Sequence, residues 1–163
     1  MNLKSNTAFW AYLSDQQRDL LVEGAYLSEE VIKGCKYCFK DYSFLVFPFA
    51  KAYEGYLKKL FRDVGYLSEK QYTSDFMRLG KLLSPNLVRR LGNKSLYKQL
   101  HDHVSEDLAS ELWITWKEGR NQVFHYFPQN FKALTFEQSQ EITQRITDAM
   151  LDSFNKLESQ IRT

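Results

Sequence analysis

The stretch 119–127, with the sequence GRNQVFHYF, combines three side chains that could act on an anionic substrate: Arg120, Asn121 and His125. An imidazole exchanges a proton near neutral pH, and a guanidinium offers several donors to a charged oxygen. On a helix, Asn121 and His125 are about 40° apart, whereas Arg120 and His125 are about 140° apart with roughly 7.5 Å of axial rise. One helix presents that pair imperfectly to a single target, so two copies about a twofold axis are expected to share a cleft. Gly119 would let those two helices approach closely.

The competing interpretation of the same stretch is structural: a core or capping histidine beside a surface arginine. The residues alone leave that alternative open.

A basic run without any acidic residue lies between positions 76 and 101. It could follow a phosphate backbone if adjoining short helices present it on one surface, because each cation displaces a condensed counterion. The alternative is a solvated basic face. The candidate RNA-binding residues are Arg78, Lys81, Arg89, Arg90, Lys94 and Lys98.

The cysteines and the other histidines give weaker signals. Cys35 and Cys38 have the C-x-x-C spacing, but zinc would need a second suitably spaced pair, and a thioredoxin-like site needs a βαβ setting. We therefore expect partly buried thiols at a helix end and no bound metal or cofactor. His101 and His103 would be about 200° apart on a helix, so they are expected at the surface.

Composition indicates one globular domain over residues 1–163. The chain is 44% hydrophobic and 26% charged, with a net charge of +2, seven glycines and three prolines. No apolar stretch reaches roughly 18 residues, so we expect no membrane-spanning helix. With two cysteines and no visible export signal, the expected location is the cytoplasm.

Helical periodicity runs through most of the chain and predicts an all-α fold, a single helical bundle. Segment 42–65 is the most apolar and is expected to be the core helix, closed by Gly65. Ser105 is expected to begin a helix that continues to Pro128. Capping boxes are predicted at Ser14/Gln17 and at Thr135/Gln138.

The stretch RNQVFH resembles the Arg-x(4–6)-His motif of the HEPN superfamily, in its form with Asn directly after Arg. The core segment YSFLVFPFAKAYEGYLKKLF is similar to the corresponding helix of HEPN toxin domains, especially those related to the RnlA/LsoA toxins. The resemblance covers roughly residues 42–158 and leaves residues 1–40 as an N-terminal helical extension. It implies a HEPN-like bundle.

The resemblance also implies a function: metal-independent cleavage of RNA by a homodimer with a composite site. The chain would then be a toxin or antiviral effector controlled by an antitoxin or another protein. By position, Arg120 is the motif arginine, Asn121 its polar companion and His125 the motif histidine. Glu54 on the core helix is a candidate to orient the arginine, although it could equally be a solvent-facing or locally paired carboxylate.

One position departs from a related pattern. HEPN toxins paired with nucleotidyltransferase antitoxins carry Arg-x4-His-x-Tyr, but here that position is Phe127, and Tyr126 is out of register. Tyr126 is therefore assigned only a supporting role. Two alternatives stay open: an inactive HEPN-like module that binds RNA, nucleotide or protein, and a helical adaptor if the basic run is scattered.

Overall fold

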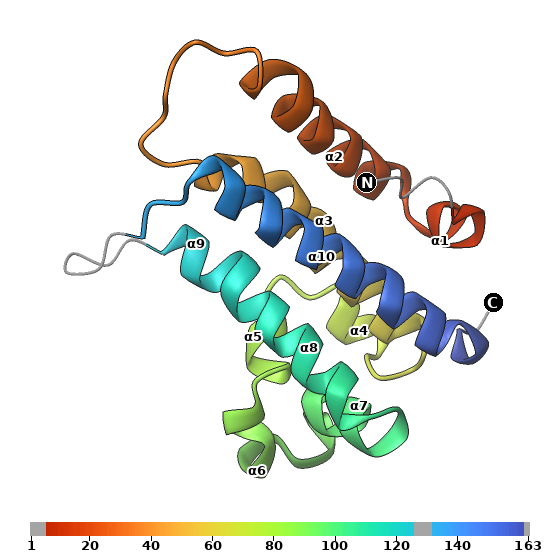
Figure 1. The fold of residues 1–163 in the computed structure, drawn as a ribbon. Coiled ribbons are helices and arrows are strands. Elements are labelled where there is room, and N and C mark those ends of the chain that lie inside the picture. Colours follow the sequence, from red (N-terminus) through yellow and green to blue (C-terminus); the bar gives the residue numbers. More distant parts are fainter. Residues whose placement is uncertain (1–5, 126–131, 162–163) are drawn as a thin grey trace.

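The computed structural model describes residues 6–125 and 132–161, and this part of the chain contains helices and loops but no strand. The prediction of an all-α fold is confirmed (Figure 1). The α-helices are α1 (Thr7–Tyr12), α2 (Asp15–Tyr26), α3 (Ser43–Asp63), α4 (Glu69–Tyr72), α5 (Leu79–Leu82), α6 (Val88–Leu91), α7 (Leu96–His103), α8 (Glu106–Trp116), α9 (Gln122–Phe124) and α10 (Phe136–Leu157). The π-helical segments are η2 (Leu27–Ile32) and η5 (Lys117–Asn121), and the 3-10 segments are η3 (Pro85–Leu87), η4 (Gly92–Lys94) and η6 (Glu158–Gln160).

Helices α2, α8 and α10 begin at the capping residues that the sequence predicts. The Ser14 hydroxyl accepts from the Gln17 backbone N–H, and the Gln17 side chain accepts from the Ser14 N–H, which forms the predicted capping box of α2. Thr135 and Gln138 make the same exchange at the start of α10. Ser105 caps α8 by accepting from the Leu108 N–H at 3.2 Å. Each cap satisfies N–H groups that the first helical turn leaves without partners.

Helix α3 is the core helix, as its apolar periodicity predicts. It ends at Asp63, and Gly65 follows with φ 82°, a left-handed conformation that favours glycine. Pro48 lies in the second turn of the helix. Its apolar residues at helical spacing form a stripe that is buried along its whole length: Phe49, Ala52, Tyr53, Tyr56, Leu57 and Leu60.

Two buried tyrosines of α3 connect the helices around it. Helix α3 packs against α2 and α10, and α10 packs against α8 (Figure 1). The Tyr53 hydroxyl donates to the Leu112 carbonyl of α8 at 3.1 Å, and the Tyr56 hydroxyl donates to the Met150 carbonyl of α10 at 2.8 Å. Burial raises the pKa of both phenols. Both hydroxyls therefore stay protonated donors, and α3 is fixed relative to α8 and α10.

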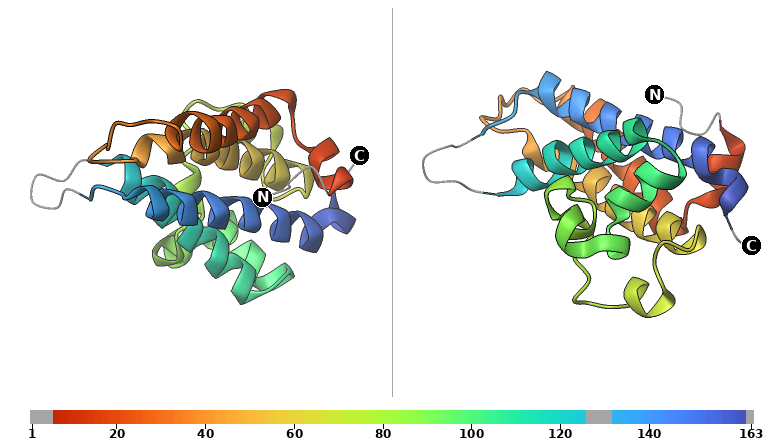
Figure 2. Two further views of the ribbon diagram at one scale, coloured as in Figure 1. Left: turned by 45° about the horizontal axis from the view of Figure 1, so that its top comes forward. Right: turned by 90° about the horizontal axis from the view of Figure 1, so that it is seen from below.

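The N-terminal helices contribute to the same core. Phe9 of α1, Leu13 directly after α1, and Leu21 of α2 are buried in one cluster with the stripe of α3. The Tyr12 hydroxyl donates to Asp63 Oδ2 at 2.7 Å, across to the end of α3. Figure 2 shows α1 beside the C-terminal end of α10 in both views.

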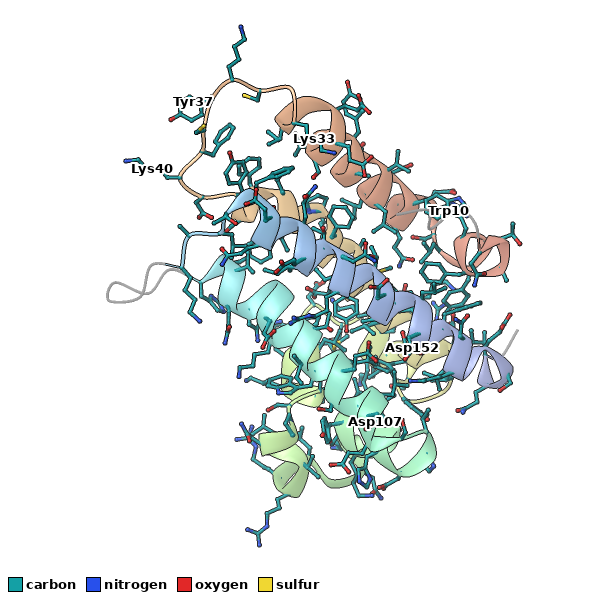
Figure 3. The ribbon with its side chains drawn as sticks, viewed as in Figure 1. Trp10, Lys33, Tyr37, Lys40, Asp107 and Asp152 are labelled. Atoms are coloured by element: carbon teal, nitrogen blue, oxygen red, sulfur yellow. The ribbon has the colours of Figure 1, made fainter. Side chains whose placement is uncertain are left out.

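The cysteine pair lies at the surface. Tyr37 and Lys40 mark the loop that joins η2 to α3 (Figure 3), and Cys35 and Cys38 are on this loop, both exposed and reduced. The expectation of partly buried thiols is wrong, because η2 ends at Ile32 and the loop beyond it carries no buried side chain as far as Cys38.

Candidate functional site

One cleft of about 540 Å³ lies between α3, the segment 77–87 and the α8–η5–α9 rod. Six of the residues selected from the sequence line it: Glu54, Arg78, Lys81, Arg120, Asn121 and His125. Arg120, Asn121 and His125 lie on one wall, and Glu54 of α3 lies with them. Its volume falls in the range of small-ligand pockets, roughly 300–1,000 Å³. The fold thus gathers a cation, a carboxylate, an amide and an imidazole at one opening.

The rod that carries Arg120 is not the continuous α-helix expected as far as Pro128. Helix α8 ends at Trp116, η5 continues as a π-helix, and the single turn of α9 ends at Phe124. His125 follows in an extended conformation, with φ −101° and ψ 125°. Pro128 lies outside the described residues.

This irregular ending corrects the angular argument made from the sequence. Because His125 lies beyond the last helical turn, helical spacing does not relate it to Arg120 or Asn121. A π-turn also changes the direction of every side chain after it, and such turns are frequent at functional sites. The helical angle expected between Arg120 and His125 therefore does not apply, and both residues line the same cleft.

Gly119 serves a different contact from the one expected. It is buried, and a Cβ there would lie 3.1 Å from Cδ1 of Ile146 on α10. The close approach that glycine permits is therefore between η5 and α10 of the same chain, rather than between the motif helices of two copies.

Arg120 is held by several groups. Its Nη2 lies 3.3 Å from Glu54 Oε2, and the other carboxylate oxygen, Oε1, pairs with Lys58 Nζ at 2.9 Å. The guanidinium lies over the ring of Trp116, 5.2 Å from the centroid. Its Nη1 donates to Asn121 Oδ1 at 3.4 Å. Glu54 is thus a locally paired carboxylate that also contacts the motif arginine, and the arrangement fixes the direction of the guanidinium.

The basic run divides between the cleft and the outer surface. Arg78 and Lys81 line the cleft together with Arg120. Arg89 and Arg90 of α6 and Lys94 of η4 are exposed. Lys98 on α7 forms an ion pair with Asp102, a residue directly after the acid-free run.

The other two histidines lie on the surface, as predicted. His101 and His103 are exposed on α7, and His101 Nδ1 lies 3.0 Å from Asp102 Oδ1. Within residues 6–125 and 132–161, no three His, Cys, Asp or Glu side chains form a group that could hold a metal ion. Tyr126 and Phe127, the residues of the nucleotidylation comparison, lie outside the described part.

Sequence reasoning missed several residues of the cleft, among them Gly80, Trp113 and Trp116. A Cβ on Gly80 would collide with the Trp116 indole Nε1, so glycine is needed for α5 to lie against α8. The signal was the spacing of the tryptophans. Trp113 and Trp116 are three residues apart, and Arg120 follows four residues after Trp116, so all three lie near one side of the rod.

No helix in the described ranges is both long enough and apolar enough to cross a membrane. Searches of curated proteins and of solved structures gave no match. A family model described as "RNase LS, bacterial toxin DBD domain" of the RnlA toxins matches residues 13–126. The match includes α2, which the resemblance had left in an unplaced extension, and it ends before α10. The match covers more than half of the chain, from the second helix through the Arg120–His125 motif, and the chain therefore belongs to the RnlA toxin family.

Proposed function

We propose that this chain is a metal-independent endoribonuclease of HEPN type, acting as a toxin or antiviral effector. The observation that supports it most is one cleft lined by Arg120, which Glu54 contacts, and by His125, Arg78 and Lys81. Three cations around one opening favour a polyanion as substrate. The family match supports a toxin with a controlling antitoxin.

The proposed reaction uses the RNA's own 2′-hydroxyl as the nucleophile. His125 removes the 2′-OH proton while the 2′-oxygen forms a bond to the adjacent phosphorus. The bond between phosphorus and the 5′-oxygen breaks, and that oxygen takes up a proton from solvent water as it leaves. The products are a 2′,3′-cyclic phosphate and a free 5′-hydroxyl. An imidazole suits this proton transfer near neutral pH.

Arg120 stabilises the charge that develops on the phosphate oxygens. A guanidinium fixed in direction before the reaction loses little free energy to reorganisation, which makes such groups effective in transition-state stabilisation. Glu54 is a positioning residue, because it contacts Arg120 rather than the substrate. Asn121 contributes an amide beside the same guanidinium.

We place a second copy of the chain beside the motif. Phe47 and Phe124 are 54% and 38% exposed, and Phe124 directly precedes His125 in the sequence. Their rings pack edge to face, with the ring centroids 5.7 Å apart. Exposed aromatic pairs of this kind favour burial by a partner surface. A twofold homodimer through this patch would bring two motif segments together, as the HEPN resemblance implies.

A cleavage assay tests the proposal. The wild-type protein is incubated with a mixed-sequence RNA in EDTA, and the product ends are identified. We expect cyclic phosphate ends, and a loss of about a hundred- to ten-thousand-fold in rate for His125→Ala. Arg120→Ala should also abolish cleavage while retaining part of the RNA binding.

The fold of each variant is the control. Neither substitution should unfold the domain. His125→Ala should change the free energy of unfolding by less than about 0.5 kcal/mol, and Arg120→Ala, which also loses the ion pair with Glu54, by about 1 kcal/mol. If the wild-type protein cuts no RNA with or without metal, the enzyme proposal fails. An inactive module that binds RNA, nucleotide or protein then takes its place.

A further inference from the structure

The cleft has a second region that the proposed chemistry does not use. Trp113 of α8 is half-buried there, and Leu87 of η3 lines the cleft with it. Arg78 and Lys81, both exposed, lie on the same α5–η3 side. An aromatic surface and an aliphatic side chain thus adjoin two cations, a few residues from the groups assigned to catalysis.

The two tryptophans of the cleft have different surroundings. Trp116 is 3% exposed. Its ring contacts the Tyr53 ring, with the centroids 6.4 Å apart, and the Arg120 guanidinium lies over it. Trp113 has no ring or cation stacked on it among residues 6–125 and 132–161. Trp113 is therefore the aromatic side chain of this cleft that can accept a flat ligand.

We infer that this region is a subsite for one unpaired base of the RNA, stacked on Trp113, with the neighbouring phosphates on Arg78 and Lys81. The inference rests on the proposed function and adds the substrate class, single-stranded RNA. Aromatic side chains stack on unpaired bases, and adjoining cations follow the backbone. A base inside a duplex is stacked on its neighbours and presents no free face, so duplex RNA is excluded from the subsite.

Binding is measured on the His125→Ala protein, so that cleavage does not interfere. The probes are a fluorescent single-stranded oligoadenylate and its duplex with oligouridylate. We expect the single strand to bind more tightly than the duplex. Trp113→Ala should weaken single-strand binding roughly 5- to 150-fold, the range that one stacked base contributes. Trp113→Phe should retain most of the affinity, since a ring remains.

Two controls separate stacking from charge. The slope of log affinity against log salt concentration measures how many phosphates the protein contacts. Lys81→Ala should reduce this slope by the amount that corresponds to about one phosphate, whereas Trp113→Ala should leave it unchanged. Tyr26→Ala removes an exposed ring from α2, and it should leave binding unchanged. Equal affinity of the parent and Trp113→Ala for the single strand would overturn the subsite.

A second measurement avoids the alanine variant in case it folds poorly. AMP should quench the tryptophan fluorescence of the His125→Ala protein, and ribose 5-phosphate should not, because only AMP carries a base. Trp113→Phe should remove the AMP-dependent quenching. If quenching persists in Trp113→Phe, the base binds elsewhere.

These outcomes are separate from those of the cleavage assay. RNA cleavage with a KM that Trp113→Ala leaves unchanged would refute the subsite and leave the ribonuclease standing. If the wild-type protein cuts no RNA but binds single-stranded RNA through Trp113, the ribonuclease proposal fails and the subsite stands.

Discussion

At the scale of single residues, Arg120 is positioned by contacts from two other elements of the fold. Glu54 of α3 contacts its guanidinium, and Trp116 of α8 lies beneath it. Lys58 occupies the other oxygen of the Glu54 carboxylate, which leaves Oε2 facing Arg120. The direction of the guanidinium therefore depends on the charge of Glu54.

Glu54→Gln tests this dependence because it keeps the shape of the side chain and removes its charge. We expect a lower kcat for RNA cleavage with KM changed less, since the arginine acts mainly in the transition state. The matched control is Glu118→Gln. Glu118 also forms an ion pair from the rod, with Arg145, but lines a different cavity. If both variants lose activity equally, Glu54 has no positioning role.

At the scale of elements, the helix starts were predictable and the end of the motif rod was not. A capping box is decided by residues three positions apart, as at Thr135 and Gln138, so a short window contains all the information. The π-turn of η5 forms where Gly119 packs on Ile146, a residue of a distant helix. The periodicity of the local sequence gives no information about such a contact between distant residues. The sequence therefore did not predict that His125 lies beyond the last helical turn.

The same distinction holds for the cleft. Arg120 and His125 were selected by their residue types and by the HEPN resemblance, and both line the cleft. Gly80 and Trp113 were missed because their role depends on how the short helices after Gly65 fold back onto α8, which is decided by tertiary packing.

Asp63 connects α1 to the end of α3. Burial alone would raise the pKa of this carboxyl, but hydrogen bonds from Tyr12, Lys59 and Arg62 lower it below its ordinary 3.8. The folded state therefore prefers the ionised carboxylate more than the unfolded chain does. Its stabilising contribution is present above about pH 4 and is lost as the pH falls through the lowered value.

Thermal unfolding between neutral pH and about pH 3 checks this prediction. At neutral pH, Asp63→Asn should melt at a lower temperature than the wild type, and the difference should narrow as the pH falls below about 4. Tyr12→Phe removes one donor, so acid destabilisation should begin at a higher pH than in the wild type. A difference between wild type and Asp63→Asn that is constant with pH would contradict the assignment.

At the scale of the whole molecule, the proposed dimer depends on the Phe47–Phe124 patch. Phe124→Glu would place a charge in an apolar interface, so sedimentation at micromolar concentration should show a monomer for this variant and a dimer for the wild type. Val22→Glu is the control, because Val22 is 42% exposed on α2, compared with 38% for Phe124. A Phe124→Glu protein that remains dimeric would show that the Phe47–Phe124 patch is not the dimer interface.

The central claim is that a second copy completes the Arg120–His125 cleft of each chain, so that the arginine of one copy acts with the histidine of the other on the same RNA. The most direct measurement uses mixed dimers, made by co-expressing Arg120→Ala and His125→Ala chains with different tags and purifying on both. Each homodimer should be inactive. The mixed dimer retains one arginine and one histidine on opposite chains, so we predict that it cleaves RNA in EDTA. An inactive mixed dimer, beside an active wild-type dimer purified in the same way, would show that each chain holds a complete site of its own.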